Sequence, residues 1–324
     1  MNYIDNIRKP IQAEMQLFGK TFAESLKTDN ELLLNVNEFV LQKSGKQLRP
    51  IIVLLSAKLC GTVNKSTIDG AISLELLHTA SLIHDDVVDY TLERRGNPSV
   101  NDKWTNKIAV LSGDYIFSKS LLRGTYTDSL DIMKSIAILG EELADGELLQ
   151  IANTTLSKTT EENYYSIIRK KTALLFATCA EVGGMSTNAT ESSLKHLRNF
   201  GEYLGICFQI KDDIFDYYED IQIGKPTGND IRDGKVTLPL IYALQHSEEN
   251  TRNKIVSLIE NKDYTPEIVQ TITRFTHENG GVIYAEEQMD KYKNKAIDEL
   301  NDFVDSDVKN SLILCAEFAA SRKS

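Results

Sequence analysis

The sequence lacks several features that mark other classes of protein. Its 324 residues include only four cysteines, Cys60, Cys179, Cys207 and Cys315, with no C-x-x-C pair and no zinc-ligand spacing, so we expect buried thiols in a reducing compartment. No apolar run approaches the roughly 18 residues that span a bilayer, and the N-terminus has no apolar signal core. These absences predict a cytoplasmic protein.

The chain also has fewer positively charged than negatively charged residues. The chain has 36 lysines and arginines against 47 aspartates and glutamates, which gives a formal charge of -11. This balance argues against nucleic-acid binding through phosphate contacts and against a polybasic membrane patch. Cations that serve a function must therefore be gathered locally.

Proline is rare, and its distribution favours helices. None of the 6 prolines lies between Pro98 and Pro226. Apolar residues recur at spacings of three and four through 71–84, 164–182 and 194–218, whereas sustained alternation is absent. We therefore predict an all-α protein.

Local signals mark two helix starts. Thr159 with Glu162 three residues later fits a capping box, and Thr265 followed by Pro266 fits an N-cap with proline in the first turn. No Gly/Ser-rich or Pro-rich linker and no long internal repeat divides the chain. We therefore predict one domain over residues 1–324.

Two acidic clusters lie more than a hundred residues apart in apolar sequence. Each has the form DDxxD, and together they comprise Asp85, Asp86, Asp89, Asp212, Asp213 and Asp216. On a helix, the first and last carboxylates of a cluster project from one face, about 5.4 Å apart, and repel each other unless a cation compensates them. Ligands that are all oxygen favour Mg²⁺, and neither cluster has the glycine and glutamate positions of an EF-hand loop.

A solvated acidic helix face is the alternative interpretation. It would account for a single DDxxD about as well as a metal site does, because acidic residues four apart are common on helices. A second copy, in an equally apolar context and with basic residues near it, favours the metal site. A helical scaffold with acidic faces would show no Mg²⁺-dependent stabilisation by a diphosphate analogue.

Groups of cations accompany the two clusters. Mg²⁺ held by two facing carboxylate sets would bind a diphosphate, which also requires cationic donors. The sequence supplies Lys46 and Arg49 in GKQLRP, Arg94 and Arg95, Lys171 with Thr172 in RKKTA, and Lys225 and Lys235 in GKPTGNDIRDGKVTLP. Each group lies in a compact motif, which favours a binding role over scattered surface charge.

Two histidines precede the first cluster. His78 is seven residues before Asp85 and therefore on the same helical stripe, so it can point toward a metal-bound head group. A single histidine on an apolar helix is usually a core residue, but the stripe favours the functional interpretation here. His84 is off the stripe, and we expect it to be structural.

Five segments occur together between Gly45 and Leu240: GKQLRP, ELLHTASLIHDDVVD, RRGNPSVN, FQIKDDIFDYYED and GKPTGNDIRDGKVTLPL. In their order and approximate spacing, the chain resembles the trans-type polyprenyl diphosphate synthases. The resemblance implies an isoprenoid-synthase-type helical bundle around a deep central cavity, with the two aspartate clusters facing each other across its mouth. It also implies a homodimer, and three Mg²⁺ ions that bind an allylic diphosphate.

The resemblance further implies roles for individual residues. Asp85, Asp89 and Asp212 would be the principal metal ligands, with Asp86, Asp213 and Asp216 as ligands or as partners of ligands. The allylic diphosphate would be bound by Arg94, Lys171 and Lys225, and isopentenyl diphosphate by Lys46, Arg49, His78 and Arg95. Gln209 and Thr172 would support the reacting allylic carbon, and Lys235 would lie near the diphosphate.

The expected reaction follows from charge. Divalent cations, lysines and arginines neutralise the diphosphate as its C–O bond breaks, which leaves an allylic cation. Exclusion of water protects this cation until the double bond of isopentenyl diphosphate adds to it. The departing diphosphate can take the released proton, so no protein base is required.

Product length should depend on side chains one or two turns before Asp85, because a helix turn and an isoprene unit are both about 5 Å long. Ala80 and Ser81 are small there, so the floor should lie deeper, at Leu74, at Leu77 or on a neighbouring helix. We therefore predict a medium or long product of about seven to ten isoprene units, as in quinone side chains. Gln150 also favours a medium or long product, because short-chain relatives often carry aspartate at this position.

Three alternatives stay open. A short-chain farnesyl or geranylgeranyl synthase would share these motifs. A class I terpene cyclase would share the fold but usually replaces the second DDxxD. A noncatalytic partner subunit tends to lose one or both clusters, whereas this chain keeps both.

Overall fold

The structure of the protein is a computed structural model, which describes residues 3–42, 45–94, 96–152, 159–218, 228–261 and 264–322. The contacts of the chain group into two compact units. Unit 1 comprises Met1–Glu141, Leu175–Gly201 and Leu300–Cys315, and unit 2 comprises Glu142–Leu174, Glu202–Glu299 and Ala316–Ser324. The single domain over residues 1–324 stays a prediction.

Unit 1 is built from helices. They are α1 (Tyr3–Arg8), a short 3-10 turn (Lys9–Ile11), α2 (Gln12–Ser25), α3 (Glu31–Gln42), α4 (Leu48–Cys60), α5 (Lys65–Val88), α6 (Val100–Lys103), α7 (Asn106–Thr125), most of α10 (Leu174–Met185) and the first parts of α8 (Leu130–Ala152), α11 (Glu191–Phe215) and α17 (Asp307–Ser321). Two-residue strands β1 (Glu93–Arg94) and β2 (Asn97–Pro98) pair antiparallel. The all-α prediction is confirmed for the described residues, apart from this small hairpin.

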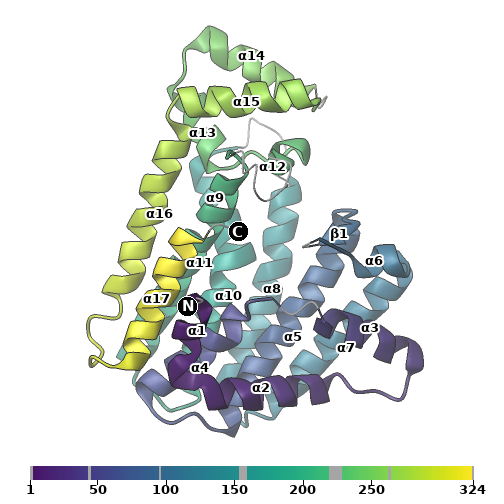
Figure 1. The fold of residues 1–324 in the computed structure, drawn as a ribbon, viewed down its shortest axis with the longest axis vertical. Helices are drawn as coiled ribbons and strands as arrows, with labels where there is room; N and C mark the ends of the chain where they lie inside the picture. Colours follow the sequence, from purple (N-terminus) through teal and green to yellow (C-terminus); the bar gives the residue numbers. More distant parts are fainter. Residues whose placement is uncertain are drawn as a thin grey trace. The chain divides into compact units, whose positions relative to one another are not determined.

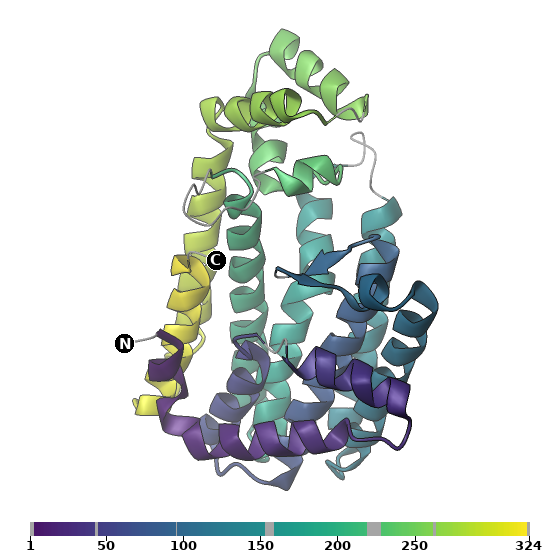
Figure 2. The ribbon, with the colours of Figure 1, turned by 45° about the vertical axis from the view of Figure 1, so that its right-hand side comes forward.

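Helix α5 carries the first aspartate cluster and is buried along most of its length. It begins with a capping box, in which the Asn64 side chain accepts from the Thr67 amide and the Thr67 hydroxyl accepts from the Asn64 amide. Helix α7 lies beside it in both views (Figures 1 and 2), and the Ser73 hydroxyl donates to the Ser120 carbonyl over 2.7 Å. These contacts fix the start and the middle of α5, the helix that ends in the aspartates.

Unit 2 contains the second aspartate cluster. Its helices are the last parts of α8, α11 and α17 together with α9 (Glu161–Ile168), α12 (Asn229–Arg232), α13 (Leu238–His246), α14 (Glu249–Glu260), α15 (Pro266–Glu278) and α16 (Gly281–Asp298). In Figure 1 the pair α14 and α15 lies next to α13, and α16 packs against α13 and α15.

The predicted helix starts are partly confirmed. Helix α15 has Thr265 as its N-cap and Pro266 in its first turn, as expected. The capping-box position was wrong by one residue, because α9 has Thr160 as its N-cap and its hydroxyl accepts from the Asn163 amide. In the sequence, Glu162 favours the first of the two adjacent threonines, and only the path of the chain selects the second.

Between α9 and α10 the helix widens into one π-helical turn, Arg169–Ala173. Lys170 and Lys171 follow each other on this turn, and both reach α8: Lys170 Nζ lies 2.6 Å from Glu142, and Lys171 Nζ lies 2.5 Å from Glu147. The lack of a side chain at Gly146 allows α8 to lie this close to the π-helical turn, because a Cβ atom there would lie 2.7 Å from the Lys170 Cβ. Single π-helical turns are frequent at functional sites.

The prediction for the cysteines is confirmed for three of the four. Cys179, Cys207 and Cys315 are buried free thiols, and burial raises the pKa of Cys207 and of Cys315 to about 12. Cys60 is half-buried, because it is the last residue of α4. In the part of the chain that the structure describes, no helix combines the length and apolar character that crossing a membrane requires.

Candidate active site

The first aspartate cluster lies at the C-terminal end of α5, in unit 1. Asp85 and Asp86 are in the last turn, and Asp89 is the first residue after the helix. Asp89 is exposed and Asp85 is half-buried, whereas Asp86 is only 4% exposed. A helix C-terminus carries partial negative charge and disfavours anions. Placing carboxylates there lowers stability, so the arrangement favours a bound cation.

Helices α4 and α5 bring several predicted substrate-binding residues together within unit 1. The Arg49 guanidinium lies 5.5 Å from the centroid of the Phe176 ring. Burial raises the pKa of Cys179, the charge of Arg49 lowers it, and the charge of Glu75 raises it further. His78 is half-buried on α5, one turn after Glu75. Arg49 and His78 thus lie on two helices, α4 and α5, that pack against each other.

Two further predicted cations of the first half of the chain, Lys46 and Arg94, lie outside helices. Lys46 is exposed just before α4, and its carbonyl accepts from Arg8 over 2.9 Å. Arg94 is in β1. The described part of the chain does not include Arg95, Lys225 or the side chain of Arg94, so the roles of these three residues stay predictions. His84 packs against α7, with Nε2 3.2 Å from the Val110 carbonyl, in keeping with a structural role.

The second aspartate cluster lies at the C-terminal end of α11, in unit 2. Asp212 is in the last turn, and its Oδ1 is 2.7 Å from Arg322 Nη2. The Arg322 side chain is 8% exposed, lies 3.7 Å over the Phe208 ring and also donates to the Phe208 carbonyl over 2.8 Å. Burial lowers the pKa of Arg322, and the charge of Asp212 opposes this effect. Arg322 is thus a counter-charge for Asp212.

Asp213 is buried beneath the cluster and has two hydrogen-bond donors. Tyr164 donates its hydroxyl to Oδ2 over 2.6 Å, and Gln209 donates Nε2 to Oδ1 over 2.9 Å. Burial and the charges of Asp230 and Asp212 raise the pKa of Asp213 well above its ordinary value, while the two donors oppose the shift. Because both oxygens are occupied by protein donors, Asp213 fits the role of a partner better than that of a metal ligand.

Asp216 is the first residue after α11 and holds the start of α12. Its two oxygens accept from the amides of Asn229, over 2.8 Å, and Asp230, over 2.9 Å. Burial raises the pKa of Asp216, and these amides oppose the rise. Burial and the charge of Asp216 raise the pKa of Asp230 to about 6. Lys235 lies beside this acidic group, with Nζ 4.0 Å from Asp230.

The π-helical turn places further predicted residues in unit 2. Besides its ion pair with Glu147, Lys171 donates to Gln150 Oε1 over 2.9 Å. The next residue, Thr172, donates its hydroxyl to Gln209 Oε1 over 2.8 Å. Predicted residues from two elements, the π-helical turn and α11, therefore meet in one hydrogen-bonded group.

The predicted chain-length residues lie on α5, before the first cluster. Leu77 and Ala80 are buried at 3% and 1% exposure, and Ser81 is half-buried with its hydroxyl donated to the His78 carbonyl. A Cβ atom added at Gly140 of α8 would lie 3.9 Å from Leu77, so Leu77 faces α8. Ala80 and Leu77 are thus core-facing, as a role in product length requires.

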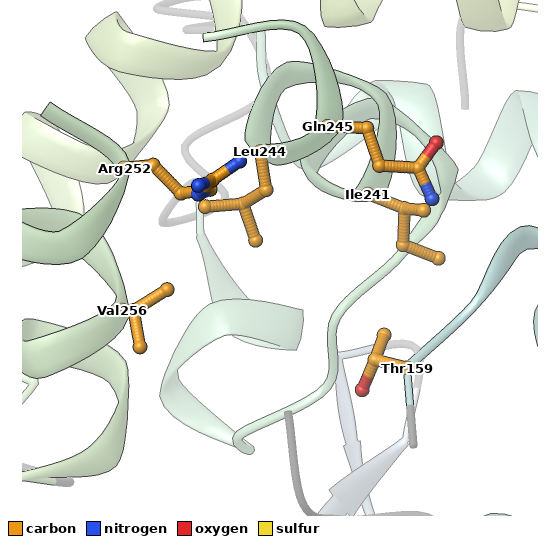
Figure 3. Close-up of a pocket in the computed structure, with 6 residues that line it drawn as sticks. All are labelled: Thr159, Ile241, Leu244, Gln245, Arg252 and Val256. Atoms are coloured by element: carbon orange, nitrogen blue, oxygen red, sulfur yellow. The ribbon is translucent and has the colours of Figure 1, made fainter. Parts of the chain in front are cut away.

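A surface pocket of about 210 Å³ also occurs in unit 2 (Figure 3). It lies between α13 and α14 and is lined by Thr159, Ile241, Leu244, Gln245, Arg252 and Val256. None of the predicted site residues lines it. With one cation and no acid or nucleophile, its lining offers no chemistry for catalysis.

A preformed metal centre is not present within the described ranges, where no three His, Cys, Asp or Glu side chains converge on one point. Mg²⁺ usually takes one or two carboxylates and completes its shell with phosphate oxygens and water. The accessible carboxylates Asp85, Asp89 and Asp212 provide oxygen donors of this kind, so the donor set fits Mg²⁺ bound together with a phosphate-bearing substrate.

Two residues that contact the second cluster were missed in the sequence. Tyr164 is seven residues before Lys171, which places both on one helical stripe, and this spacing could have drawn attention to it. Arg322 follows an apolar segment at the end of the last helix, 110 residues after Asp212. No local pattern connects them.

Comparison with known proteins identifies the family. A family model described as polyprenyl synthetase matches residues 30–275. The octaprenyl diphosphate synthase of Haemophilus influenzae is 33% identical over 320 residues, which cover 98% of this chain and 97% of that protein. The chain therefore belongs to the polyprenyl synthetase family and is a prenyltransferase.

Solved structures agree with this assignment. The polyprenyl synthase of Caulobacter crescentus, complexed with calcium and isoprenyl diphosphate, has a TM-score of 0.93 and 29% identity, and the match covers 99% of this chain and 98% of that one. The geranylgeranyl pyrophosphate synthase of Bacteroides thetaiotaomicron has a TM-score of 0.86 and 40% identity, and the match covers 99% and 100%. The predicted isoprenoid-synthase-type helical fold is confirmed.

Proposed function

We propose that the protein is a Mg²⁺-dependent polyprenyl diphosphate synthase, which adds isopentenyl diphosphate to an allylic diphosphate such as farnesyl or geranyl diphosphate. The observation that carries the proposal is the presence of two aspartate clusters, each at the C-terminal end of a helix, where uncompensated carboxylates are unfavourable. We further propose that the two units act as one domain, with both clusters serving one substrate beside a deep cavity.

Asp85, Asp89 and Asp212 would hold the metal ions, three in number by resemblance to the family. Bound Mg²⁺ would neutralise the diphosphate as it leaves and so favour cleavage of the C–O bond. The calcium and isoprenyl diphosphate in the Caulobacter crescentus structure support a divalent cation beside such a ligand in that protein.

The protein's own residues supply the remaining charge and orientation. Lys171, held by Glu147 and Gln150, would bind the allylic diphosphate together with Arg94 and Lys225. Lys46, Arg49, His78 and Arg95 would bind isopentenyl diphosphate, and Lys235 would lie near the allylic diphosphate. The oxygens of Thr172 and Gln209 would face the allylic carbon as positive charge develops on it.

For the product we propose a medium or long chain of about seven to ten isoprene units. Small, buried Ala80 and half-buried Ser81 one turn before the first cluster support this length, as does the octaprenyl product in the name of the Haemophilus influenzae relative. A short-chain product is the second candidate, because the Bacteroides thetaiotaomicron structure, at 40% identity, is named a geranylgeranyl pyrophosphate synthase.

A direct assay separates these candidates. Purified protein is incubated with Mg²⁺, labelled isopentenyl diphosphate and farnesyl diphosphate, and the lipids are sized by chromatography. We expect labelled prenyl diphosphates of about seven to ten units that disappear when EDTA is added. A product that stops at four units would favour the short-chain candidate, and the absence of any elongated product would refute the proposed function.

Replacing Ala80 with tyrosine tests the role of α5 in product length. The added ring should block the growing chain and shorten the main product by at least one isoprene unit, with a smaller shortening for Ala80→Val. Chromatography of the products measures both effects, and circular dichroism checks that each variant is folded. An unchanged length distribution in folded Ala80→Tyr would exclude Ala80 from the length-determining surface.

We also propose that the protein is a homodimer of the cytoplasm. The support for a dimer is an apolar surface of unit 1, formed by exposed side chains of α7 and the first part of α8: Val110, Leu111, Phe117, Leu122, Leu130 and Ile138. Contiguous apolar surface on one face commonly marks a protein interface. Sedimentation equilibrium of the wild type and of Leu111→Glu would test it, with a monomeric variant as the expected result.

A further inference from the structure

Four side chains of unit 2 form one hydrogen-bonded series, which we name the Tyr164 network: Tyr164, Asp213, Gln209 and Thr172. The Tyr164 hydroxyl lies 2.6 Å from Asp213 Oδ2, and Gln209 Nε2 lies 2.9 Å from Asp213 Oδ1. At the other end, the Thr172 hydroxyl lies 2.8 Å from Gln209 Oε1. Tyr164 and Asp213 are buried at 6% and 4% exposure, so water does not compete for these bonds.

We propose that Tyr164 is a positioning residue which, through Asp213, fixes the side-chain amide of Gln209 so that its oxygen lies beside Thr172. The inference rests on the proposed function, in which Gln209 and Thr172 face the reacting allylic carbon. It adds Tyr164, which touches neither substrate nor metal, and it assigns Asp213 to the orientation of Gln209 in place of metal binding.

The orientation of the Gln209 side-chain amide follows from which neighbouring groups can donate and which can accept hydrogen bonds. While Tyr164 and Asp213 share a single proton along their hydrogen bond, Oδ1 of Asp213 can only accept, so the atom of Gln209 that faces it is the NH₂ group. This holds whether the shared proton lies on Tyr164 or on the other oxygen of Asp213, because Oδ1 is an acceptor in both cases. The amide oxygen of Gln209 is then left to accept from Thr172, as observed.

The orientation matters because the two ends of an amide carry opposite partial charges. An amide oxygen stabilises positive charge that develops nearby in the transition state, whereas an NH₂ group in the same place opposes it. Without the Tyr164 hydroxyl, the carboxyl group of Asp213 loses the partner that fixes its rotation. Gln209 then loses its fixed acceptor and can turn its NH₂ group toward Thr172. The loss should appear in kcat, because substrate binding precedes the development of charge.

The chain offers a matched control one residue away. Tyr165 is half-buried, its ring packs edge-on against Tyr164 at 5.4 Å, and its hydroxyl is buried without a hydrogen-bond partner among the described residues. Tyr164→Phe and Tyr165→Phe therefore remove the same atom from adjacent rings, but only the first breaks the Tyr164 network. We expect Tyr164→Phe to lower kcat about tenfold, and Tyr165→Phe to leave it within about twofold of the wild type.

The experiment measures kcat and the KM of both substrates for the wild type, Tyr164→Phe, Tyr165→Phe, Gln209→Ala and the double variant Tyr164→Phe/Gln209→Ala. Thermal unfolding of each variant confirms that assays are made well below its midpoint. KM should change less than about twofold in Tyr164→Phe. In the Gln209→Ala background, removal of the Tyr164 hydroxyl should have no further effect on kcat, because Tyr164 acts through Gln209.

Three results would overturn the inference while the wild type is active: equal kcat in Tyr164→Phe and the wild type, equal losses in the two phenylalanine variants, or additive losses in the double variant. Additive losses would mean that Tyr164 acts by a route that does not include Gln209. A wild type that forms no prenyl diphosphate would instead refute the proposed function, so the two failures are distinguishable.

Discussion

The two aspartate clusters have the same sequence form but differ in how far the protein already engages them. Both end a helix, and both bury the middle aspartate at 4% exposure. In unit 1 the last aspartate, Asp89, is exposed to solvent. In unit 2 the first and last aspartates are held by Arg322 and by two backbone amides. The last aspartate is therefore exposed in the first cluster and bound by two backbone amides in the second.

The two copies of the DDxxD motif therefore have different surroundings and need not have the same role. In unit 2, Asp213 of the cluster forms hydrogen bonds with Tyr164 and Gln209, so this carboxylate orients protein groups. In unit 1, two carboxylates at the end of α5 are accessible, as metal binding together with substrate requires.

The largest expected difference comes from two glycines on α8. Alanine normally stabilises a helix by about 0.5–1 kcal/mol relative to glycine, and at Gly140 in unit 1 the added Cβ atom would meet nothing nearer than 3.8 Å. At Gly146 in unit 2 it would lie 2.7 Å from the Lys170 Cβ and displace the π-helical turn, a cost of about 1–3 kcal/mol. We expect Gly140→Ala to raise and Gly146→Ala to lower the free energy of unfolding, as measured in urea.

The substitutions Gly140→Ala and Gly146→Ala should also differ in their effect on catalysis. Displacement of the π-helical turn in Gly146→Ala moves Lys171 and should raise the KM for the allylic diphosphate, whereas Gly140→Ala should leave that KM unchanged. Equal stability and equal KM in the two variants would mean that Lys171 does not depend on the close packing of α8 against the turn.

Alanine substitutions at the last aspartates of the two clusters should have different effects on the stability of the protein. Asp216→Ala removes the acceptor of two backbone amides and should destabilise the protein by about 1–2 kcal/mol, with faster hydrogen exchange in α12. Asp89→Ala removes an exposed charge from a helix C-terminus and should be neutral or stabilising by a few tenths of a kcal/mol. Equal destabilisation by both substitutions would contradict the contrast between an exposed Asp89 and a hydrogen-bonded Asp216.

The smallest effect is expected from Arg322. Its guanidinium pairs with Asp212, which is a metal ligand in the proposed function, so Arg322→Gln should lower the Mg²⁺ concentration for half-maximal thermal stabilisation about fivefold. Arg322→Lys retains the charge and should resemble the wild type. Weaker Mg²⁺ binding in Arg322→Gln would mean that Arg322 supports the metal site and does not compete with it.

The helices and the two clusters could be predicted from the sequence, because helical periodicity and the DDxxD spacing are local properties. The partners of the second cluster could not. Arg322 reaches Asp212 across 110 residues, and Tyr164 reaches Asp213 across 49, so these contacts depend on how distant helices pack. The π-helical turn was also missed, since RKKTA fits an ordinary helix and only the approach of Gly146 shows why it widens.

The central claim is that Asp85 and Asp212, from different units, serve one Mg²⁺–diphosphate assembly. The most direct test is the thermal stabilisation of the wild type, Asp85→Asn and Asp212→Asn by a non-hydrolysable allylic diphosphate analogue, with Mg²⁺ and with EDTA. We predict that the wild type is stabilised only with Mg²⁺ and that either substitution alone removes most of this shift. A full Mg²⁺-dependent shift in either single variant would contradict the claim.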